Sequence, residues 1–233
     1  MGDLKLQFLV RPDPAADPCR FAADVTDRLA PRLLAHDPAA LKLTFTPCAP
    51  PRLTVIPFRR GALALVSAVP RDGDTDPEEW ARTIGGTLGP VRIDGYRVVE
   101  STPLAYARGW PDGARTPGVG LLTLFNRRPG QPDEQFFRAW HGGHTPLSLR
   151  IHPMWNYVRN VVTEPATAGT PRLDAIVEEH FRSRDDLLNP VRFFGGPLAM
   201  VPNMARVALD IRNFIDLSSM ETWFVDELHV RSA

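Results

Sequence analysis

The chain has 233 residues, of which 43% are apolar and 23% are charged, with 27 basic and 27 acidic residues in balance. This composition is typical of a globular protein with a hydrophobic core. The balanced charge, with no basic stripe, argues against nucleic acid or an anionic membrane surface as a partner. No stretch approaches 18 uninterrupted apolar residues, and the N-terminus lacks a signal-peptide pattern. We therefore expect a cytoplasmic protein with no membrane partner.

Cysteine and lysine are both scarce. The two cysteines, Cys19 and Cys48, stand in no C-x-x-C spacing, so they indicate neither a disulfide framework nor a zinc site. The only lysines are Lys5 and Lys42. This scarcity weakens any Schiff-base mechanism, since that chemistry requires a buried amine.

Two stretches of the chain share an ordered series of features. Residues 4–47 and 121–165 each begin with a short apolar run that ends near Arg-Pro, continue with an amphipathic segment and close with a β-like run. Two further prolines keep their spacing, since Pro31 and Pro38 answer Pro146 and Pro153. The series predicts an internal duplication.

The later segments extend the match. In chain order, strands are predicted at 4–10, 41–46, 62–69 and 92–99 in the first half, and at 121–125, 157–164, 173–181 and 221–230 in the second. Helices are predicted after each first strand and again at 78–87 and 203–214. Each half then has the βαββαβ order of a ferredoxin-like unit, an α+β arrangement whose open sheet face can be covered by a second such sheet.

The halves meet in a stretch rich in Pro and Gly. We place a first, degenerate repeat at 1–102, a linker at 103–117 and a second repeat at 118–233. The linker also carries Tyr106 and Trp110, whose aromatic rings favour an ordered crossover over a loose tether.

The richest stretch for chemistry lies in the second half. Phe137, Trp140, His144 and Leu147 follow one another at helical spacing, so they share one face if the helix continues through Gly142-Gly143. The counterpart of His144 in the first half is Leu29. An imidazole on this face can act as a general acid or base. It can equally be a partly buried histidine that is satisfied by a backbone carbonyl.

Other polar residues are candidates for the same site. Tyr157 and Arg159 share one face of their strand and Asn160 lies on the other, while the sequence leaves open which face is interior. Glu178 and His180 also share a face, either near the imidazole or, as we favour, on the outer rim. His141 precedes His144 by three residues, and we favour its exposure. The two histidines alone do not have metal-site spacing, so we expect no metal.

Several of these residues carry a family resemblance. The pattern Phe125-x-Arg127-Arg128-Pro129-Gly130, then Phe137-x-x-Trp140-x-x-x-His144-x-Pro146-Leu147, then Tyr157-Val158-x-Asn160, resembles the EthD family of dimeric α/β-barrel proteins. The resemblance implies that the two ferredoxin-like halves pair their antiparallel sheets into one intrachain barrel, with the first half a copy that lacks the histidine.

The resemblance also frames the function. It implies an enzyme without a cofactor that acts on a hydrophobic, aromatic or polyketide-like carbonyl compound. His144 would be the acid/base and Tyr157 or Asn160 would bind the enolate oxygen. The further candidates for substrate contact are Phe137, Trp140, His141, Arg159, Glu178 and His180. Elimination, decarboxylation or cyclisation is the leading chemistry. The alternatives are a cofactor-free monooxygenase, or a non-catalytic binder of small molecules or haem. A homodimer is possible.

Overall fold

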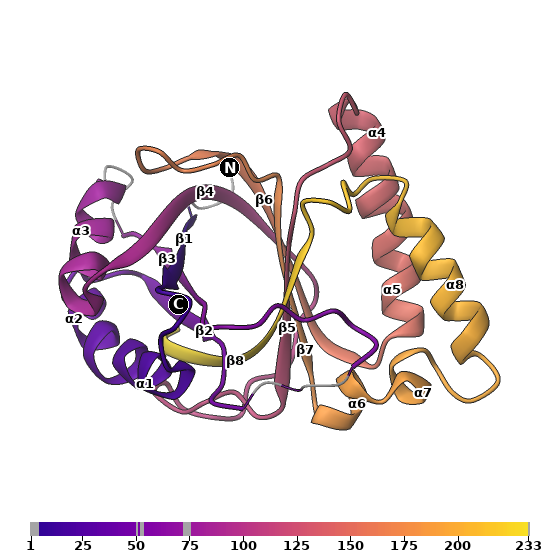
Figure 1. Cartoon of the computed structure of the whole chain (residues 1–233), viewed down its shortest axis with the longest axis horizontal. Coiled ribbons are helices and arrows are strands. Elements are labelled where there is room, and N and C mark those ends of the chain that lie inside the picture. The colour runs from indigo at the N-terminus through magenta and orange to yellow at the C-terminus, as the bar shows by residue number, and fades with distance from the viewer. Residues whose placement is uncertain (1–4, 50, 52–53, 72–75, 233) are drawn as a thin grey trace.

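The computed structural model describes residues 5–49, 51, 54–71 and 76–232 (Figure 1). The first half runs through β1 (Lys5–Pro12), α1 (Pro18–Ala23), a π-helical segment η1 (Asp24–Leu29), α2 (Ala30–Leu34), β2 (Ala40–Phe45), β3 (Ala64–Val69), α3 (Pro77–Leu88) and β4 (Val91–Leu104). The second half runs through β5 (Val119–Phe125), α4 (Asp133–Phe137), a π-helical segment η2 (Arg138–His144), α5 (Thr145–Ile151), β6 (Met154–Pro165), β7 (Ala175–Phe181), α6 (Arg184–Leu188), α7 (Pro190–Phe193), α8 (Met200–Ile211) and β8 (Glu221–Arg231).

The eight strands close into one antiparallel barrel in the order β1-β3-β2-β8-β5-β7-β6-β4. Within each half the spatial order is the same, with the last strand beside the first, then the third and then the second. The halves join through β2 with β8, where Leu43 faces Leu228, and through β4 with β6, where Val99 faces Val161. The predicted intrachain barrel of two ferredoxin-like repeats is therefore confirmed. The first repeat's last strand runs to Leu104, two residues into the stretch predicted as linker.

Strand alternation divides the side chains between the barrel interior and the outer faces, which the helices cover. One end of the interior is apolar and is filled by residues such as Leu65, Leu124 and Trp223. Farther along, the interior becomes polar, with Gln7, Lys5 and other charged side chains buried. The outer faces carry separate apolar cores beneath each helix layer. Both faces of the sheet are therefore buried, which explains why several strands show no clean polar alternation.

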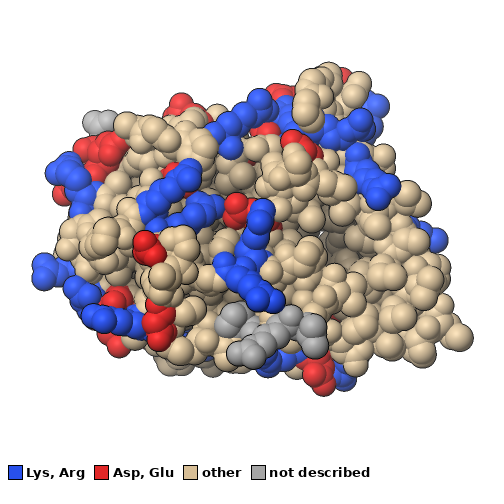
Figure 2. Space-filling view, in the orientation of Figure 1, with Lys and Arg blue, Asp and Glu red and all other residues tan. Residues whose placement is uncertain are grey.

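The helices of each half lie on the outside of its own sheet (Figure 1). In the first half they pack against an apolar core that includes Leu29, Leu33 and Trp80. In the second half α8 lies outermost beside α5, and none of its twelve residues is buried. The outer side of α8 and the segment before it expose Leu198, Val201 and Leu209. This end of the molecule accordingly shows little charge in the space-filling view, whereas charges of both signs mix over the barrel (Figure 2).

One expectation about the cysteines is wrong. Cys19, in α1, and Cys48, in the loop after β2, form a disulfide, with their Cα atoms 4.2 Å apart. A separation of 29 residues carried no motif, and only the packing of α1 beside the end of β2 brings the two thiols together. Among the described residues, no helix combines the length and apolar character required to cross a membrane.

Candidate active site

A cavity of about 130 Å³ lies between the outer face of the second-half sheet and its helices. Strands β5, β6 and β7 supply one wall, and η2, α5 and α8 supply the other. The helix layer places His144 and Ser148 at the cavity, and the sheet places Tyr157 and Glu179 there. Trp140 and Phe214 belong to its aromatic lining.

His144 is oriented by a carboxylate. Its Nδ1 lies 2.7 Å from Oδ2 of Asp210 on α8, and its Nε2 lies 3.1 Å from Oγ of Ser148, one turn onward. Because an ionised carboxylate only accepts hydrogen bonds, Nδ1 of the neutral ring donates to Asp210 and Nε2 carries the lone pair. The imidazole ring also packs against Phe214, with centroids 5.1 Å apart. This is the arrangement of an oriented general base.

The order Ser148, His144, Asp210 is also that of a hydrolase triad. Ser148, however, is fully buried within α5. Backbone N–H groups inside a helix are committed to helical hydrogen bonds. The Ser148 hydroxyl therefore has no pair of N–H donors beside it to bind an oxyanion. We assign Ser148 to holding the imidazole.

The helix bearing His144 does continue through Gly142-Gly143, but in a widened form. Both repeats contain a π-helical segment, and these end at the corresponding residues Leu29 and His144. In each repeat a proline follows two residues later, and its missing N–H breaks the regular ladder of hydrogen bonds. The first repeat fills this position with fully buried leucine, whereas the second places an imidazole at a cavity.

Two polar side chains reach the cavity from the sheet. Tyr157 on β6 and Glu179 on β7 are register partners, so their side chains are neighbours on the outer face. Burial raises the pKa of Tyr157 to about 12, with the nearby Glu179 adding to the effect. Its hydroxyl is therefore protonated at neutral pH and can donate a hydrogen bond.

Glu179 is the more unusual group. Burial raises the pKa of its carboxyl to about 8, and its side chain forms no hydrogen bond with any described residue. It lines the cavity. At pH 7 the carboxyl is therefore mostly protonated, and a protonated carboxyl in an apolar site can donate a hydrogen bond or a proton to a developing oxyanion.

The rest of the lining is aromatic. Trp140 and Phe214 stack nearly parallel, with centroids 6.5 Å apart, and the ring of Phe125 meets both edge-on. Aromatic walls of this kind bind flat apolar molecules and exclude water. His152 closes one end, where its Nδ1 lies 2.8 Å from the Phe193 carbonyl and burial lowers its pKa to about 4.

Three predicted contact residues lie near the cavity without lining it. Phe137 packs against His141, with centroids 5.0 Å apart. His141 is half-buried, not exposed as we favoured, because it rests on Trp140 and Phe137. Burial, and then the charge of Arg159, lower its pKa to about 4. Arg159 donates to Ser101 and Thr145 and so ties β6 to β4 and α5.

The other three predicted residues belong elsewhere. Asn160, Glu178 and His180 all point into the barrel interior, on the opposite face of the sheet from His144. Asn160 therefore cannot share an enolate with Tyr157 at His144. The outer-rim prediction for Glu178 and His180 is also wrong, since both are buried. The alternation of side chains along a strand correctly placed Glu178 and His180 on one face. The sequence of a single strand does not show whether that face is the barrel interior or the outer face.

Sequence reasoning also missed Asp210, Ser148 and Glu179. Glu179 could have been found, because adjacent glutamates on a strand that is covered on both sides must enter different compartments. Ser148 stands four residues after His144, at helical contact spacing. Asp210 carried no local signal, because α8 approaches His144 only through the tertiary fold.

Fold and site together define the class. An eight-stranded barrel of two ferredoxin-like units, with a cavity between sheet and helices, is the fold of the dimeric α/β-barrel proteins. Here a single chain forms the whole barrel. Within this class, residues 128–218 match the EthD domain. The match agrees with the family resemblance that the sequence predicted, and the matched residues lie in the second repeat.

Solved structures agree on the fold. An "anthrone oxidase-like protein" matches with a TM-score of 0.62 and 12% identity, over 99% of this chain and 92% of that one. A "putative monooxygenase" from Fusobacterium nucleatum matches with a TM-score of 0.54 and 8% identity, over 99% of this chain and 94% of that one. A "putative monooxygenase" from Lactobacillus acidophilus matches with a TM-score of 0.52 and 9% identity, over 99% of this chain and 98% of that one. No curated protein sequence matches the chain.

Proposed function

We propose that this chain is an enzyme, working without a cofactor, that removes a proton next to the carbonyl of a small aromatic or polyketide-like compound. One observation carries the proposal: an imidazole oriented by Asp210 and a protonated Glu179 meet at one aromatic cavity from opposite layers. A base that is oriented by a carboxylate, facing a neutral acid across a cavity, is typical of enolate chemistry.

Each residue of the cavity has a distinct role in this reaction. His144 takes the proton at Nε2 once the Ser148 hydroxyl rotates away from that lone pair, and Asp210 stabilises the imidazolium that results. Tyr157 and Glu179 donate hydrogen bonds to the enolate oxygen, where the negative charge develops. In an elimination, the enolate expels a β-hydroxyl, which leaves as water with the proton that His144 took up. The products are a conjugated carbonyl compound and water.

The cavity sets the size of the substrate. Pockets for drug-sized ligands commonly measure roughly 300–1,000 Å³, and this one measures about 130 Å³. A single aromatic ring with a short side chain suits it. A polycyclic substrate requires α8 to move outward, which is physically reasonable because α8 carries no buried residue.

A cofactor-free monooxygenase is the second candidate, and the matched structures described as anthrone oxidase-like and as monooxygenases favour it. The first step is the same proton removal at His144. The carbanion then reduces O₂ and combines with it to give a hydroperoxide, which loses water. In sum, a CH₂ group and O₂ become a C=O group and H₂O.

The shared step is the one to test. In D₂O, 4-hydroxy-4-phenylbutan-2-one exchanges its α-protons at a base, and proton NMR follows the exchange while ultraviolet absorption follows loss of water. Anthrone in an oxygen electrode tests the monooxygenase branch. We expect His144→Gln to slow α-proton exchange by roughly 10²-fold or more.

The matched control is His141→Gln, one turn earlier on the same helix and outside the cavity lining. It should retain the wild-type exchange rate. Wild-type protein that exchanges neither compound above the buffer rate, or a His144→Gln variant that exchanges at the wild-type rate, contradicts the proposal.

A further inference from the structure

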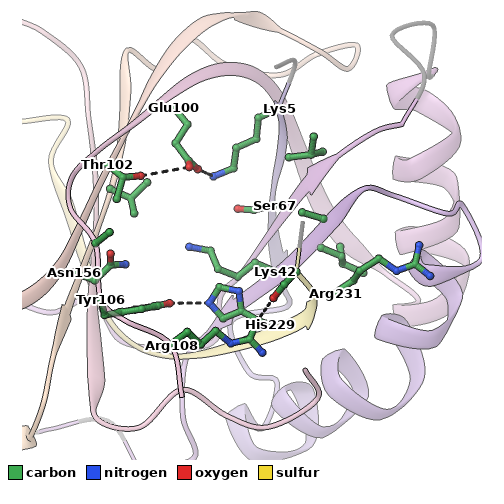
Figure 3. A pocket seen from close by; sticks show the side chains of 16 residues that line it. Lys5, Lys42, Ser67, Glu100, Thr102, Tyr106, Arg108, Asn156, His229 and Arg231 are labelled. Carbon is green, nitrogen blue, oxygen red and sulfur yellow. Dashed lines mark hydrogen bonds and ion pairs between the residues drawn. The ribbon is translucent and has the colours of Figure 1, made fainter. Parts of the chain in front are cut away.

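A second and larger cavity, of about 370 Å³, opens at one end of the barrel (Figure 3). It lies on the inner face of the sheet, so the wall of strands separates it from His144. Strands β1, β2, β3, β4, β6 and β8 all contribute to its lining, together with the segment that follows β4. Nothing in the proposed activity uses it.

The only two lysines of the chain both line this cavity. Lys42 is 2.8 Å from Glu178 and 3.2 Å from Glu227, and Lys5 pairs with Glu100 and lies 2.9 Å from Asn160. An ammonium group has three donors, so each lysine has one donor left after these contacts.

The buried carboxylates behind Lys42 are already well satisfied. Glu178 also accepts from Thr44 at 3.1 Å and from Asn160 at 3.2 Å. Glu227 accepts from Tyr106 at 2.5 Å and from Thr116 at 2.8 Å. Because these neutral donors fill other positions on the carboxylates, Lys42 forms two ion pairs and keeps one N–H donor, and Figure 3 shows its ammonium group pointing into the cavity.

Two further polar groups face the same space without a full set of partners. Ser67 accepts a hydrogen bond from Gln7 at 2.9 Å, and its own O–H donates to no described residue. Asn156 is 5% exposed and lines the cavity, yet its side-chain amide forms no hydrogen bond with any described residue. The atoms of this amide stay accessible within the cavity, so they can hydrogen-bond to a molecule bound there.

The donors meet an apolar surface. Leu41, Val69, Ala105 and Val158 line the same cavity. Glu100 is the one carboxylate lining it among the described residues, and Lys5 occupies that group. The cavity therefore offers unused donors at Lys42, Ser67 and Asn156, and the remaining wall accommodates a compact hydrocarbon body.

We propose that the barrel mouth is a second binding site, separate from the His144 cavity, for a small organic carboxylate with a compact apolar body. The carboxylate accepts from Lys42, Ser67 and the Asn156 amide, and the body rests on the apolar wall. This inference does not depend on the proposed activity.

The test uses 4-fluorobenzoate as the probe, with fluorine NMR of the full-length protein to measure its dissociation constant. We expect saturable binding, about 10-fold weaker in Asn156→Leu and several-fold weaker in Ser67→Ala, since each removes one hydrogen bond to a charged ligand. Neither substitution breaks the buried ion pairs, so both variants should fold. The neutral analogue 4-fluorobenzamide should bind far more weakly.

The control is Glu179→Gln, at a residue that lines the His144 cavity and not the barrel mouth, and it should leave 4-fluorobenzoate affinity unchanged. Four results overturn the proposal. The first is equal binding of the amide and the carboxylate, and the second is wild-type affinity in both Asn156→Leu and Ser67→Ala. The third is displacement of the probe by equimolar inorganic phosphate, because the site would then recognise charge alone. Absence of saturation at millimolar probe overturns it as well.

Discussion

The raised pKa of the Glu179 carboxyl predicts how the stability of the protein depends on pH, and this can be tested without a substrate. Burial raises its pKa from the ordinary value of 4.5 to about 8. A carboxyl with a higher pKa in the folded than in the unfolded chain binds its proton more tightly when folded. Stability is therefore lost as the pH rises from about 4.5 to about 8, and the loss levels off above that range.

The size of the effect follows from the shift. Each pKa unit corresponds to about 1.4 kcal/mol. The raised pKa therefore lowers the free energy of unfolding by about 3 kcal/mol at pH 7, where the carboxyl is ionised mainly in the unfolded chain, and by about 5 kcal/mol at pH 9. Glu179→Gln keeps the shape and removes the ionisation. Its free energy of unfolding should exceed that of wild type by about 3 kcal/mol at pH 7 and by under about 1 kcal/mol at pH 5.

Urea unfolding followed by tryptophan fluorescence at pH 5, 7 and 9 measures this difference. The neighbouring Glu178→Gln is the matched control, because the Lys42 and Lys5 charges hold the pKa of Glu178 below its usual range. That substitution should destabilise the fold at pH 7 by ~3 kcal/mol, the opposite sign. A Glu179→Gln variant that is less stable than wild type, or whose advantage does not change with pH, refutes the reasoning.

Three other predictions concern the same architecture. Asp210→Asn should lower the rate of α-proton exchange by ~10²-fold or more with little change in fold, because the His144 ring loses its anionic partner; NMR exchange and circular dichroism separate the two effects. Lys42→Met should destabilise the protein by ~3–5 kcal/mol in urea unfolding, since it leaves Glu178 and Glu227 short of a cation, and an unchanged midpoint would contradict the ion-pair geometry. Backbone amides of α8 should exchange hydrogen faster than those of α5, because α8 has no buried residue; equal protection by mass spectrometry would rule out α8 as the moving wall.

The fold was largely predictable because its information is local and repeated. Proline positions, apolar runs and element order recur between the halves, and βαββαβ halves have few ways to cover their open faces. The position of His144 was predictable from helical spacing, since Trp140 and Leu147 share its side of the helix. The helical form was not, because the widening at η2 depends on how Pro146 interrupts the ladder within a packed layer.

The partners of His144 could not be predicted for a different reason. Asp210 is 66 residues away along the chain, and its contact exists only once α8 lies beside η2. Glu178 and Glu179 show the limit of periodicity, since alternation separates adjacent side chains without saying which one enters the barrel. Scarcity of lysine argued against Schiff-base chemistry as a starting hypothesis, yet it concealed that strand register gathers both lysines at one cavity.

The charges inside the barrel also bear on why this chain closes on itself. The first repeat supplies Lys5 and Lys42, and the second supplies Glu178, Glu227 and the amide of Asn160. Pairing two first repeats would bring lysines together without Glu178 and Glu227, and pairing two second repeats would bury the glutamates without a lysine. Unpaired buried charges cost several kcal/mol each, so the two halves select each other. Once unlike halves are required, their helix layers no longer need to match. One can fill its π-helical position with Leu29 for packing, while the other keeps His144 at a cavity.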